Sequence, residues 1–340
     1  MANSMYNKEI MIDVVLANYN HANTINTAID ALNNQTLKPN KIYIIDDAST
    51  DDSWSKLILA SKKHANLVLL KNLVNEGANN CYNKGLELCT SDQIYFAAAD
   101  DVTCPELFER CAKALTSNPK AAFAAAEAIV FDTDKKRYSM RPVIQPKIIG
   151  KLITPENVQR EFMSNDNWIM TGACVYKTKF VKDASGLNTK LGAFSDSILA
   201  KKLAFRYGCI FLKYTGIRWN ITKSGFSRSL YKDNKEFSKL KSELQLFIQS
   251  NKEFPIWYWE KFSKHLAFNQ MRLGLLNKET WLENFNENFP KLIFLSHCTY
   301  VKNKKIFRSI ILIITFIKFR PYKISRILYT YFLRFLDKEI

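Results

Sequence analysis

The chain has 340 residues, of which 47% are hydrophobic and 24% charged, and this ordinary globular composition excludes a wholly disordered protein. Its length predicts one large or two modest domains. The net charge of +17 indicates anionic partners, such as nucleotides, nucleic acid or an acidic membrane surface.

Cysteine usage and the apolar runs indicate a cytoplasmic protein. The seven cysteines form no CxxC pair, which favours reduced, buried thiols over disulfides or a zinc site. The first ten residues lack a basic and an apolar region, so we expect no secretory signal. The longest apolar candidate, 309–317, has about half the length that a membrane span needs.

Apolar β-forming runs alternate with helical patterns over the first 100 residues. We expect strands at 10–17, 41–45, 67–70 and within 93–102, with helices between them, the third over 78–88. In the first helix the apolar residues follow helical spacing: Ile25, Ala28, Ile29 and Leu32. This order predicts an α/β fold with a Rossmann-like, mostly parallel sheet covered by helices on both faces.

Three of the expected strands end in polar residues, and right-handed crossovers bring such ends to one edge of the sheet. The clusters are Asn18–Asn20, Asp46–Thr50 and the pair Asp100-Asp101. Two adjacent carboxylates are costly unless a cation or a sugar hydroxyl engages them. The alternative is that one of them caps the following helix, which has Pro105 in its first turn.

Further elements follow Asp101. We expect strands at 121–131, 168–176 and 209–213, a helix beginning at Thr154-Pro155, and a helix over 196–207 ended by Gly208. After about residue 231 the pattern changes to helices with aromatic-rich faces.

The last segment, 302–340, is basic and amphipathic. From 302 to 334 it contains nine Lys or Arg and no acid, interleaved with aliphatic and aromatic residues. Such a segment is typical of helices that lie on an anionic membrane surface. The alternative is a terminal helix that packs on its own domain and keeps a solvated basic face.

Read together, VVLANYN, IIDDAST and NEGANNCYNKGLELCTSDQIYFAAADD resemble the family 2 glycosyltransferases of GT-A fold, over about 11–226. The resemblance implies an inverting transferase that takes a sugar from a nucleoside diphosphate, usually uridine, with Mn²⁺ or Mg²⁺. We therefore expect a GT-A catalytic domain over 1–230, a helical extension over 231–301 and the basic tail over 302–340.

The resemblance also implies roles for the strand-end residues. Asp101 matches the metal ligand and Asp100 the acid that faces the ribose. Asp47 matches the acid that accepts from the base N–H, Tyr19 the aromatic that stacks on the base, and Ala17 a backbone contact. Ala98 stands where many relatives have another aspartate.

Later residues match the rest of the site. Arg218, Lys223 and Arg228 fall in the segment that closes over the diphosphate, where they could hold phosphate oxygens. Asn220 stands where many relatives have histidine, so a metal-ligand role there is doubtful.

An inverting transfer needs a base to take the proton of the acceptor hydroxyl. Asp196, in GAFSDSILAKKL, matches the family base, although an acid there could simply favour the helix N-terminus. Glu127 and Asp166 are weaker candidates. Trp168 and Gly172 fall where relatives line the acceptor pocket, and a core tryptophan is the alternative interpretation of the first.

The expected function is sugar transfer from a nucleotide-sugar donor, a UDP-sugar, to a glycan or lipid-linked acceptor in bacterial surface-glycan assembly. The protein would work at the inner face of the cell membrane. An inactive scaffold of the same family and a nucleotidyltransferase are the alternatives, but VVLANYNHAN lacks the glycine-rich phosphate loop of the latter and the fingerprint of a dinucleotide oxidoreductase. No nucleic-acid-binding motif is present.

Overall fold

The computed structural model describes residues 10–134, 136–221, 234–274, 313–319 and 323–336. The chain divides into two compact units. The first comprises Met1–Pro142, Lys147–Val158 and Ile169–Asn220, and the second Val143–Pro146, Gln159–Trp168 and Ile221–Ile340. The domain boundaries predicted at 230 and 301 lie outside the described residues.

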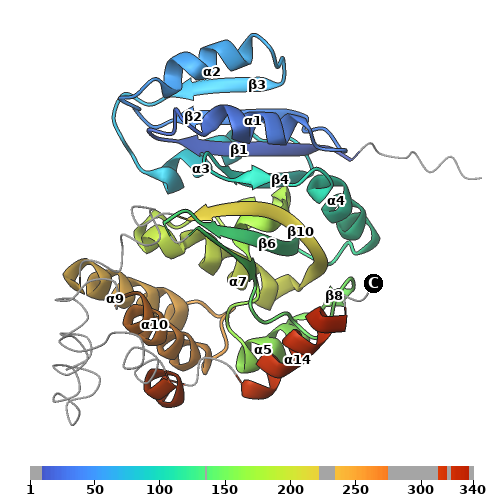
Figure 1. Cartoon of the computed structure of the whole chain (residues 1–340), viewed down its shortest axis with the longest axis vertical. Coiled ribbons are helices and arrows are strands. Elements are labelled where there is room, and N and C mark those ends of the chain that lie inside the picture. Colours follow the sequence, from blue (N-terminus) through green and yellow to red (C-terminus); the bar gives the residue numbers. More distant parts are fainter. Residues whose placement is uncertain (1–9, 135, 222–233, 275–312, 320–322, 337–340) are drawn as a thin grey trace, which may run out of the picture. The chain divides into compact units, whose positions relative to one another are not determined.

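The first unit is built on a mixed sheet with the strand order β3-β2-β1-β4-β9-β6-β10-β5 (Figure 1). Strands β3, β2, β1 and β4 are parallel, whereas β9 is antiparallel to β4 and β6. The strands are β1 (Ile12–Asn18), β2 (Lys41–Asp46), β3 (Leu67–Lys71), β4 (Gln93–Ala98), β5 (Val102–Thr103), β6 (Phe123–Asp132), β7 (Arg137–Arg141), β8 (Leu152–Ile153), β9 (Cys174–Lys177) and β10 (Cys209–Ile221). The predicted mixed α/β fold with a mostly parallel central sheet is confirmed.

Helices flank this sheet. They are α1 (Ile25–Asn33), α2 (Ser53–Ser61), α3 (Ala78–Leu88), α4 (Leu107–Ser117), α6 (Thr178–Asp183) and α7 (Ser195–Tyr207), with short 3₁₀ turns η1 (Thr171–Ala173) and η2 (Thr189–Phe194). Helix α5 (Pro155–Ser164) begins in the first unit and ends in the second. The four apolar residues predicted for the first helix are the buried residues of α1.

Alternate residues of β1 contact different helices, because side chains of a strand point alternately to its two faces. Val14 and Leu16 belong to the core that includes the buried side of α1. Val15 faces α3, where Gly85 leaves no room for a side chain: a Cβ on Gly85 would lie 2.3 Å from Val15 Cγ1.

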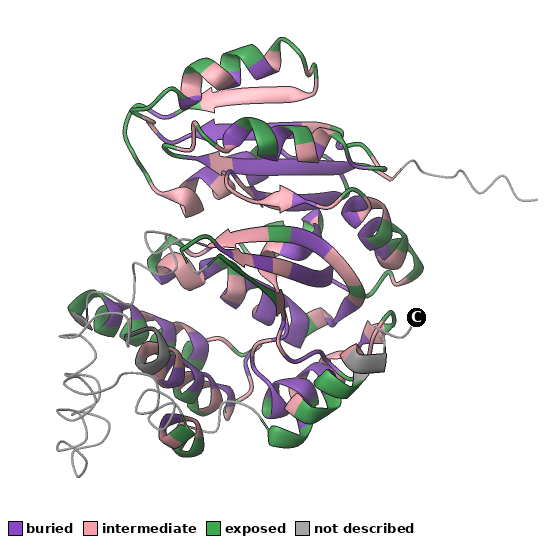
Figure 2. Ribbon diagram, viewed as in Figure 1, coloured by how far each residue is buried: buried purple, intermediate pink, exposed green. Residues whose placement is uncertain are grey.

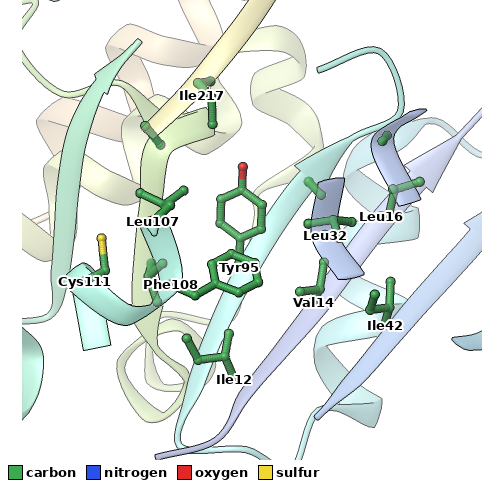
Figure 3. Packing of buried hydrophobic residues seen from close by; sticks show 14 of the residues in the cluster. Ile12, Val14, Leu16, Leu32, Ile42, Tyr95, Leu107, Phe108, Cys111 and Ile217 are labelled. Carbon is green, nitrogen blue, oxygen red and sulfur yellow. The ribbon is translucent and has the colours of Figure 1, made fainter. Parts of the chain in front are cut away.

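The centre of the core is Tyr95 on β4. Its ring lies between β1 and α4, where it packs on the ring of Phe108 at 5.1 Å between centroids (Figure 3). Its hydroxyl donates to the Gly172 carbonyl at 2.7 Å. The central strands β1, β2 and β4 are mostly buried, whereas β3 is largely half-buried and β7 is largely exposed (Figure 2).

Register determines where the strands end. Ala17 pairs with Ala98, and Asn18 pairs with Asp46, so β1, β2 and β4 finish at the same edge of the sheet. The prediction that their polar ends share one edge is confirmed.

Several predicted bounds were wrong. Residues 168–173 are not a strand; β9 begins only at Cys174, after the turn η1. The strand predicted at 209–213 continues to Ile221, because its later part, at Ile217 and Arg218, pairs with β5, which lies far away in the sequence. No strand was predicted over 137–141, but Arg137–Arg141 pairs with β6 as β7. Helix α2 begins at Ser53 and α4 at Leu107, so Asp51, Asp52 and Pro105 precede the helices.

The second unit contains the helices α9 (Asn234–Ser250), α10 (Tyr258–Gly274) and α14 (Ile324–Leu336). Its core is aromatic: Tyr258 packs on Phe262 and Phe254, and Phe162 packs on Trp168. Among the described residues, no helix combines the length and apolar character required to cross a bilayer.

Candidate active site

Asp47, just past the end of β2, accepts three hydrogen bonds. Its Oδ1 accepts from Asn72 Nδ2 at 2.7 Å and from the Glu76 N–H at 2.9 Å, and its Oδ2 accepts from the Gly77 N–H at 2.8 Å. Gly77 has a φ of +87°, a conformation that glycine adopts without strain. Asp47 therefore shapes the loop that leads into α3.

The Cys81 thiol also interacts with Asp47. Burial raises the pKa of this thiol, and the charge of Asp47 and a side-chain hydrogen bond to it add to the rise. Asp47 is 2% exposed. A carboxylate offers about four acceptor positions, so the protein itself fills most of the capacity of Asp47, and the contact to a nucleobase stays a prediction.

The loop that carries Tyr19 is tied to the loop after β2. Asn20, with a φ of +57°, accepts the Thr50 N–H at 2.8 Å, and Asp51 accepts the Ala22 N–H at 2.9 Å. Tyr19 is 44% exposed beside this anchored backbone. Its ring is therefore free to stack on a planar ligand at the sheet edge.

Asp100 and Asp101 follow β4 directly, and the end of β10 holds them in place. Asn220 donates its backbone N–H to Asp101 Oδ1 at 3.1 Å and its side-chain amide to the Asp100 carbonyl at 2.7 Å. Burial and the neighbouring Asp100 raise the pKa of Asp101 well above its ordinary value, against the opposing effects of Asn220 and the Arg218 charge. Neither acid caps α4, which has no side-chain cap.

This carboxylate pair fits a hard divalent cation. The raised pKa of Asp101 shows that the described surroundings do not fully compensate its negative charge. Mg²⁺ and Mn²⁺ often bind to one or two carboxylates, with phosphates and water completing the shell. Within the described ranges, no cluster of three or more His, Cys, Asp or Glu could form an all-protein metal site.

Asp196 lies in the first turn of α7. Its Oδ2 accepts from the Thr171 hydroxyl at 2.6 Å, and its Oδ1 accepts from the Ser197 N–H at 2.6 Å. The residue keeps access to solvent, but the protein packed around the carboxylate desolvates it and raises its pKa. The hydrogen bonds from Thr171 and Ser197 oppose this shift. A raised pKa brings a carboxylate closer to the range in which it can accept a proton near neutral pH.

The candidate base and the acid pair belong to one site. Burial is the largest cause of the raised pKa of the Tyr82 phenol. The negative charges of three carboxylates raise this pKa further, with decreasing effect from Asp196 to Asp101 to Asp100. The η1 turn joins them: Thr171 binds Asp196, and a Cβ on the adjacent Gly172 would lie 3.9 Å from Asp101 Oδ2.

The remaining predicted residues lie in different surroundings. Arg218 is exposed on β10 and lowers the pKa of Asp101, and Ala17 is half-buried at the end of β1. Trp168 belongs to the second unit and is completely buried against Phe162, a core position. Lys223 and Arg228 lie outside the described residues.

The two weaker base candidates are buried. Glu127 is 7% exposed on β6. Asp166 is 1% exposed in the second unit and accepts from the Tyr258 hydroxyl at 2.8 Å. Burial of both side chains favours structural roles for them.

Sequence reasoning missed three residues at the site: Thr171, Tyr82 and Asn72. Thr171 was hidden in a stretch interpreted as a strand, although a threonine beside Gly172 could have signalled a turn. Asn72 follows β3, so the rule used for the other strand ends would have found it. No sequence signal marks Tyr82, whose hydroxyl donates to the Ala97 carbonyl at 3.0 Å.

Comparison with known proteins agrees with this geometry. Residues 13–175 match the model of Glycosyl transferase family 2. Amylovoran biosynthesis glycosyltransferase AmsB of Erwinia amylovora is 36% identical over 98 residues, which cover 28% of this chain and 32% of that protein. UDP-Glc:alpha-D-GlcNAc-diphosphoundecaprenol beta-1,3-glucosyltransferase WfaP of Escherichia coli is 32% identical over 91 residues, 27% of this chain and 36% of that protein. The matched stretches thus span about a third of these relatives.

Solved structures resemble most of the chain. S. aureus TarS 1-349 in complex with UDP-GlcNAc has a TM-score of 0.61 at 14% identity, covering 88% of this chain and 90% of that one. Mannosyltransferase PcManGT from Pyrobaculum calidifontis, in complex with GDP-Man and Mn²⁺, has a TM-score of 0.56 at 15% identity, covering 91% and 85%. These likenesses show the fold. Residues 13–175 therefore match glycosyl transferase family 2 in sequence, and the fold of the chain is the GT-A fold of these solved structures.

Proposed function

We propose that this protein is a metal-dependent inverting glycosyltransferase that moves a sugar from a nucleoside-diphosphate donor, a UDP-sugar, to a glycan or lipid-linked acceptor. The observation that carries the proposal is the grouping of Asp100, Asp101 and Asp196 around Tyr82, with Thr171 and Gly172 on the turn that joins them. An acid pair for a cation and a separate, desolvated base are the two parts that such a transfer needs.

The donor would lie along the edge where β1, β2 and β4 end. Tyr19 would stack on the base, and Asp47 would receive a base N–H. The Ala17 backbone would contact the nucleoside, and Asp100 would accept from the ribose hydroxyls. Because both UDP-GlcNAc and GDP-Man occur in the structural neighbours, the donor test has to include both nucleotides.

Asp101 would hold the divalent cation, Mn²⁺ or Mg²⁺, with Asp100 beside it. When bound, this cation stabilises the negative charge that develops on the departing diphosphate. Arg218, Lys223 and Arg228 would contact the phosphate oxygens. The Asn220 N–H keeps Asp101 Oδ1 in a fixed direction and favours its ionised form.

Asp196 would take the proton of the acceptor hydroxyl as that oxygen attacks the anomeric carbon opposite the diphosphate. Its raised pKa improves proton acceptance, and the Thr171 hydroxyl keeps its carboxylate oriented. Gly172, with no side chain, would leave room for the acceptor between Asp196 and Asp101.

The biological setting we propose is bacterial surface-polysaccharide assembly at the inner face of the cell membrane. The named roles of relatives in amylovoran synthesis and in transfer to a diphosphoundecaprenol acceptor support this setting. The basic tail over 302–340 supports a peripheral position there.

The test is donor hydrolysis and transfer by the full chain. We expect one donor from a panel of UDP-sugars and GDP-mannose to raise the melting temperature and to release nucleoside diphosphate, in each case only with Mn²⁺ or Mg²⁺. Asp101→Asn is the matched control, since it keeps the shape of the side chain and removes its charge. If no donor binds or turns over with either metal, the inactive scaffold is favoured instead.

A further inference from the structure

Helix α14 buries two of its polar side chains, Arg326 and Thr330. Arg326 is 4% exposed and Thr330 is 1% exposed. Arg326 Nη2 donates to the Gln145 carbonyl at 2.6 Å and to Glu161 Oε2 at 3.0 Å. The Thr330 hydroxyl accepts from the Gln145 N–H at 3.3 Å. The side of α14 that faces the second unit is thus held by an ion pair and hydrogen bonds.

Several large apolar residues of α14 are exposed, and much of the helix is coloured as exposed in Figure 2. Ile324, Leu328, Tyr331 and Phe332 are 63%, 65%, 62% and 59% exposed. Their spacing of i, i+4, i+7 and i+8 places them on one side of the helix. This face, called here the α14 apolar face, reverses the usual orientation of an amphipathic helix on a globular core.

The preceding helical segment, 313–319, has the same arrangement. Thr315 is completely buried, whereas Ile313 and Ile317, one turn apart, are 58% and 59% exposed. Two helical segments of one tail therefore turn aliphatic residues outward. A single exposed aliphatic residue needs no explanation, but a repeated outward face indicates a contact surface.

The buried ion pair explains why α14 does not rotate to bury its apolar face. Rotation by half a turn would expose Arg326 and break its ion pair with the buried Glu161 carboxylate. Breaking a buried ion pair is strongly unfavourable, so the pair holds the helix in this orientation. The tail contains nine Lys or Arg residues between 302 and 334. Of these, Arg326 cannot contact lipid in this state, because it is buried in the ion pair with Glu161.

The charges around the face indicate what covers it. Lys318 and Lys323 are exposed on either side of the short gap between the two helical segments, and the sequence from 302 to 334 contains no acid. A second copy of the chain would bring these same cations against each other, because a two-fold contact pairs a patch with itself. An anionic lipid surface instead attracts the cations and accepts the apolar side chains.

We propose that the α14 apolar face inserts into the interfacial layer of an anionic membrane, and that the Arg326–Glu161 pair holds it facing outward. The proposal deepens the membrane position in the proposed function and rests on it. Apolar insertion supplies the salt-resistant part of binding, and the exposed lysines supply the salt-sensitive part. Truncation of 302–340 would be a poor test, because it removes the partner of buried Glu161.

The experiment uses the full chain and point variants in vesicle co-sedimentation. Vesicles of phosphatidylethanolamine with phosphatidylglycerol are compared with phosphatidylcholine vesicles, at low and high salt. We expect wild-type protein to bind the anionic vesicles. L328N/F332N should weaken this binding by about tenfold or more at both salt concentrations, since two large apolar side chains lose their burial. K318Q/K323Q should weaken it mainly at low salt.

The matched control is L246N/I256N, which removes two equally exposed apolar residues of the second unit outside the tail, 66% and 102% exposed in the wild type. It should bind as the wild type does. Donor hydrolysis without vesicles should be unchanged in all variants, which separates this proposal from the proposed catalytic function. The proposal would be overturned if the wild-type protein did not bind anionic vesicles, or if L328N/F332N bound them as the wild type does. It would also be overturned if the wild type were a dimer that L328N/F332N converts to a monomer.

Discussion

The backbone N–H of Asn220 donates to Asp101 Oδ1 at 3.1 Å, so the end of β10 directly supports the carboxylate assigned to the cation. The Asn220 amide also donates to the Asp100 carbonyl at 2.7 Å. A residue that departs from the histidine of many relatives therefore holds both acids in place. Its backbone bond lowers the pKa of Asp101, whereas burial and Asp100 raise it more strongly.

The first prediction follows from this raised pKa. Asp101→Asn should abolish metal-dependent transfer and yet make the metal-free protein more stable at neutral pH. A carboxyl whose pKa is higher in the folded state contributes stability below its unfolded pKa and loses it as pH rises through the folded value. The Asn side chain does not ionise, so the variant does not lose this stability as pH rises. Its amide oxygen can still accept the Asn220 N–H.

Thermal unfolding as a function of pH, with and without Mn²⁺, would check this. The stability advantage of Asp101→Asn should appear as pH rises from the acid range and should vanish when Mn²⁺ and donor stabilise the wild type. Asp100→Asn should have a milder effect on transfer. Full metal-dependent transfer by Asp101→Asn would remove Asp101 from the cation site.

Much of the parallel half of the sheet was predictable from local pattern. The apolar spacing of α1 and the short β-forming runs depend on neighbours in the sequence, and parallel strands joined by helices place their ends at one edge. Asp47, Asp100 and Asp101 could therefore be assigned to the same edge from the sequence alone. The hydrogen bond between Asp101 and Asn220 could not be predicted from the sequence, because it joins residues 119 positions apart.

The antiparallel half depended on distant pairing. β10 extends to Ile221 because its later part pairs with β5, and nothing within 214–221 indicates this. In the tail, the presence of basic residues without acids led to the prediction that the cations face lipid. Glu161, more than a hundred residues away, instead draws Arg326 into the protein and turns α14. Tertiary partners, rather than local propensity, decide both cases.

The second prediction concerns the close approach of α3 to the sheet. Gly85→Ala should lower the free energy of unfolding by about 1–3 kcal/mol, the usual cost of overpacking. A Cβ there would lie 2.3 Å from Val15 Cγ1 and 3.1 Å from Ile45 Cδ1. The gain from replacing a helical glycine, about 0.5–1 kcal/mol, is smaller. Urea denaturation measures the change, and Val15→Ala in the same chain should partly relieve it. An unchanged or more stable Gly85→Ala would show that β1 and α3 can separate freely.

The third prediction concerns the candidate base. Asp196→Asn should still bind donor and metal but lose transfer by about 10²–10⁴-fold, the usual contribution of a positioned base. Isothermal titration with donor measures the first property, and product formation measures the second. Glu127→Gln and Asp166→Asn are the controls and should retain transfer. The base is misassigned if Asp196→Asn transfers normally while one of the controls does not.

The last prediction tests Thr171 as the residue that positions Asp196. The Thr171 hydroxyl donates to Asp196 Oδ2 at 2.6 Å and so favours the ionised carboxylate, lowering a pKa that burial has raised. Thr171→Val removes this donor at nearly constant volume, so the pKa of Asp196 should rise further. Because the base acts when ionised, the acid limb of the kcat/KM profile should move to higher pH, with activity recovering at alkaline pH. Thr171→Ser, which keeps the hydroxyl, should restore the wild-type profile. A uniform loss of activity at every pH, without displacement of the limb, would instead assign Thr171 a purely structural role in the η1 turn.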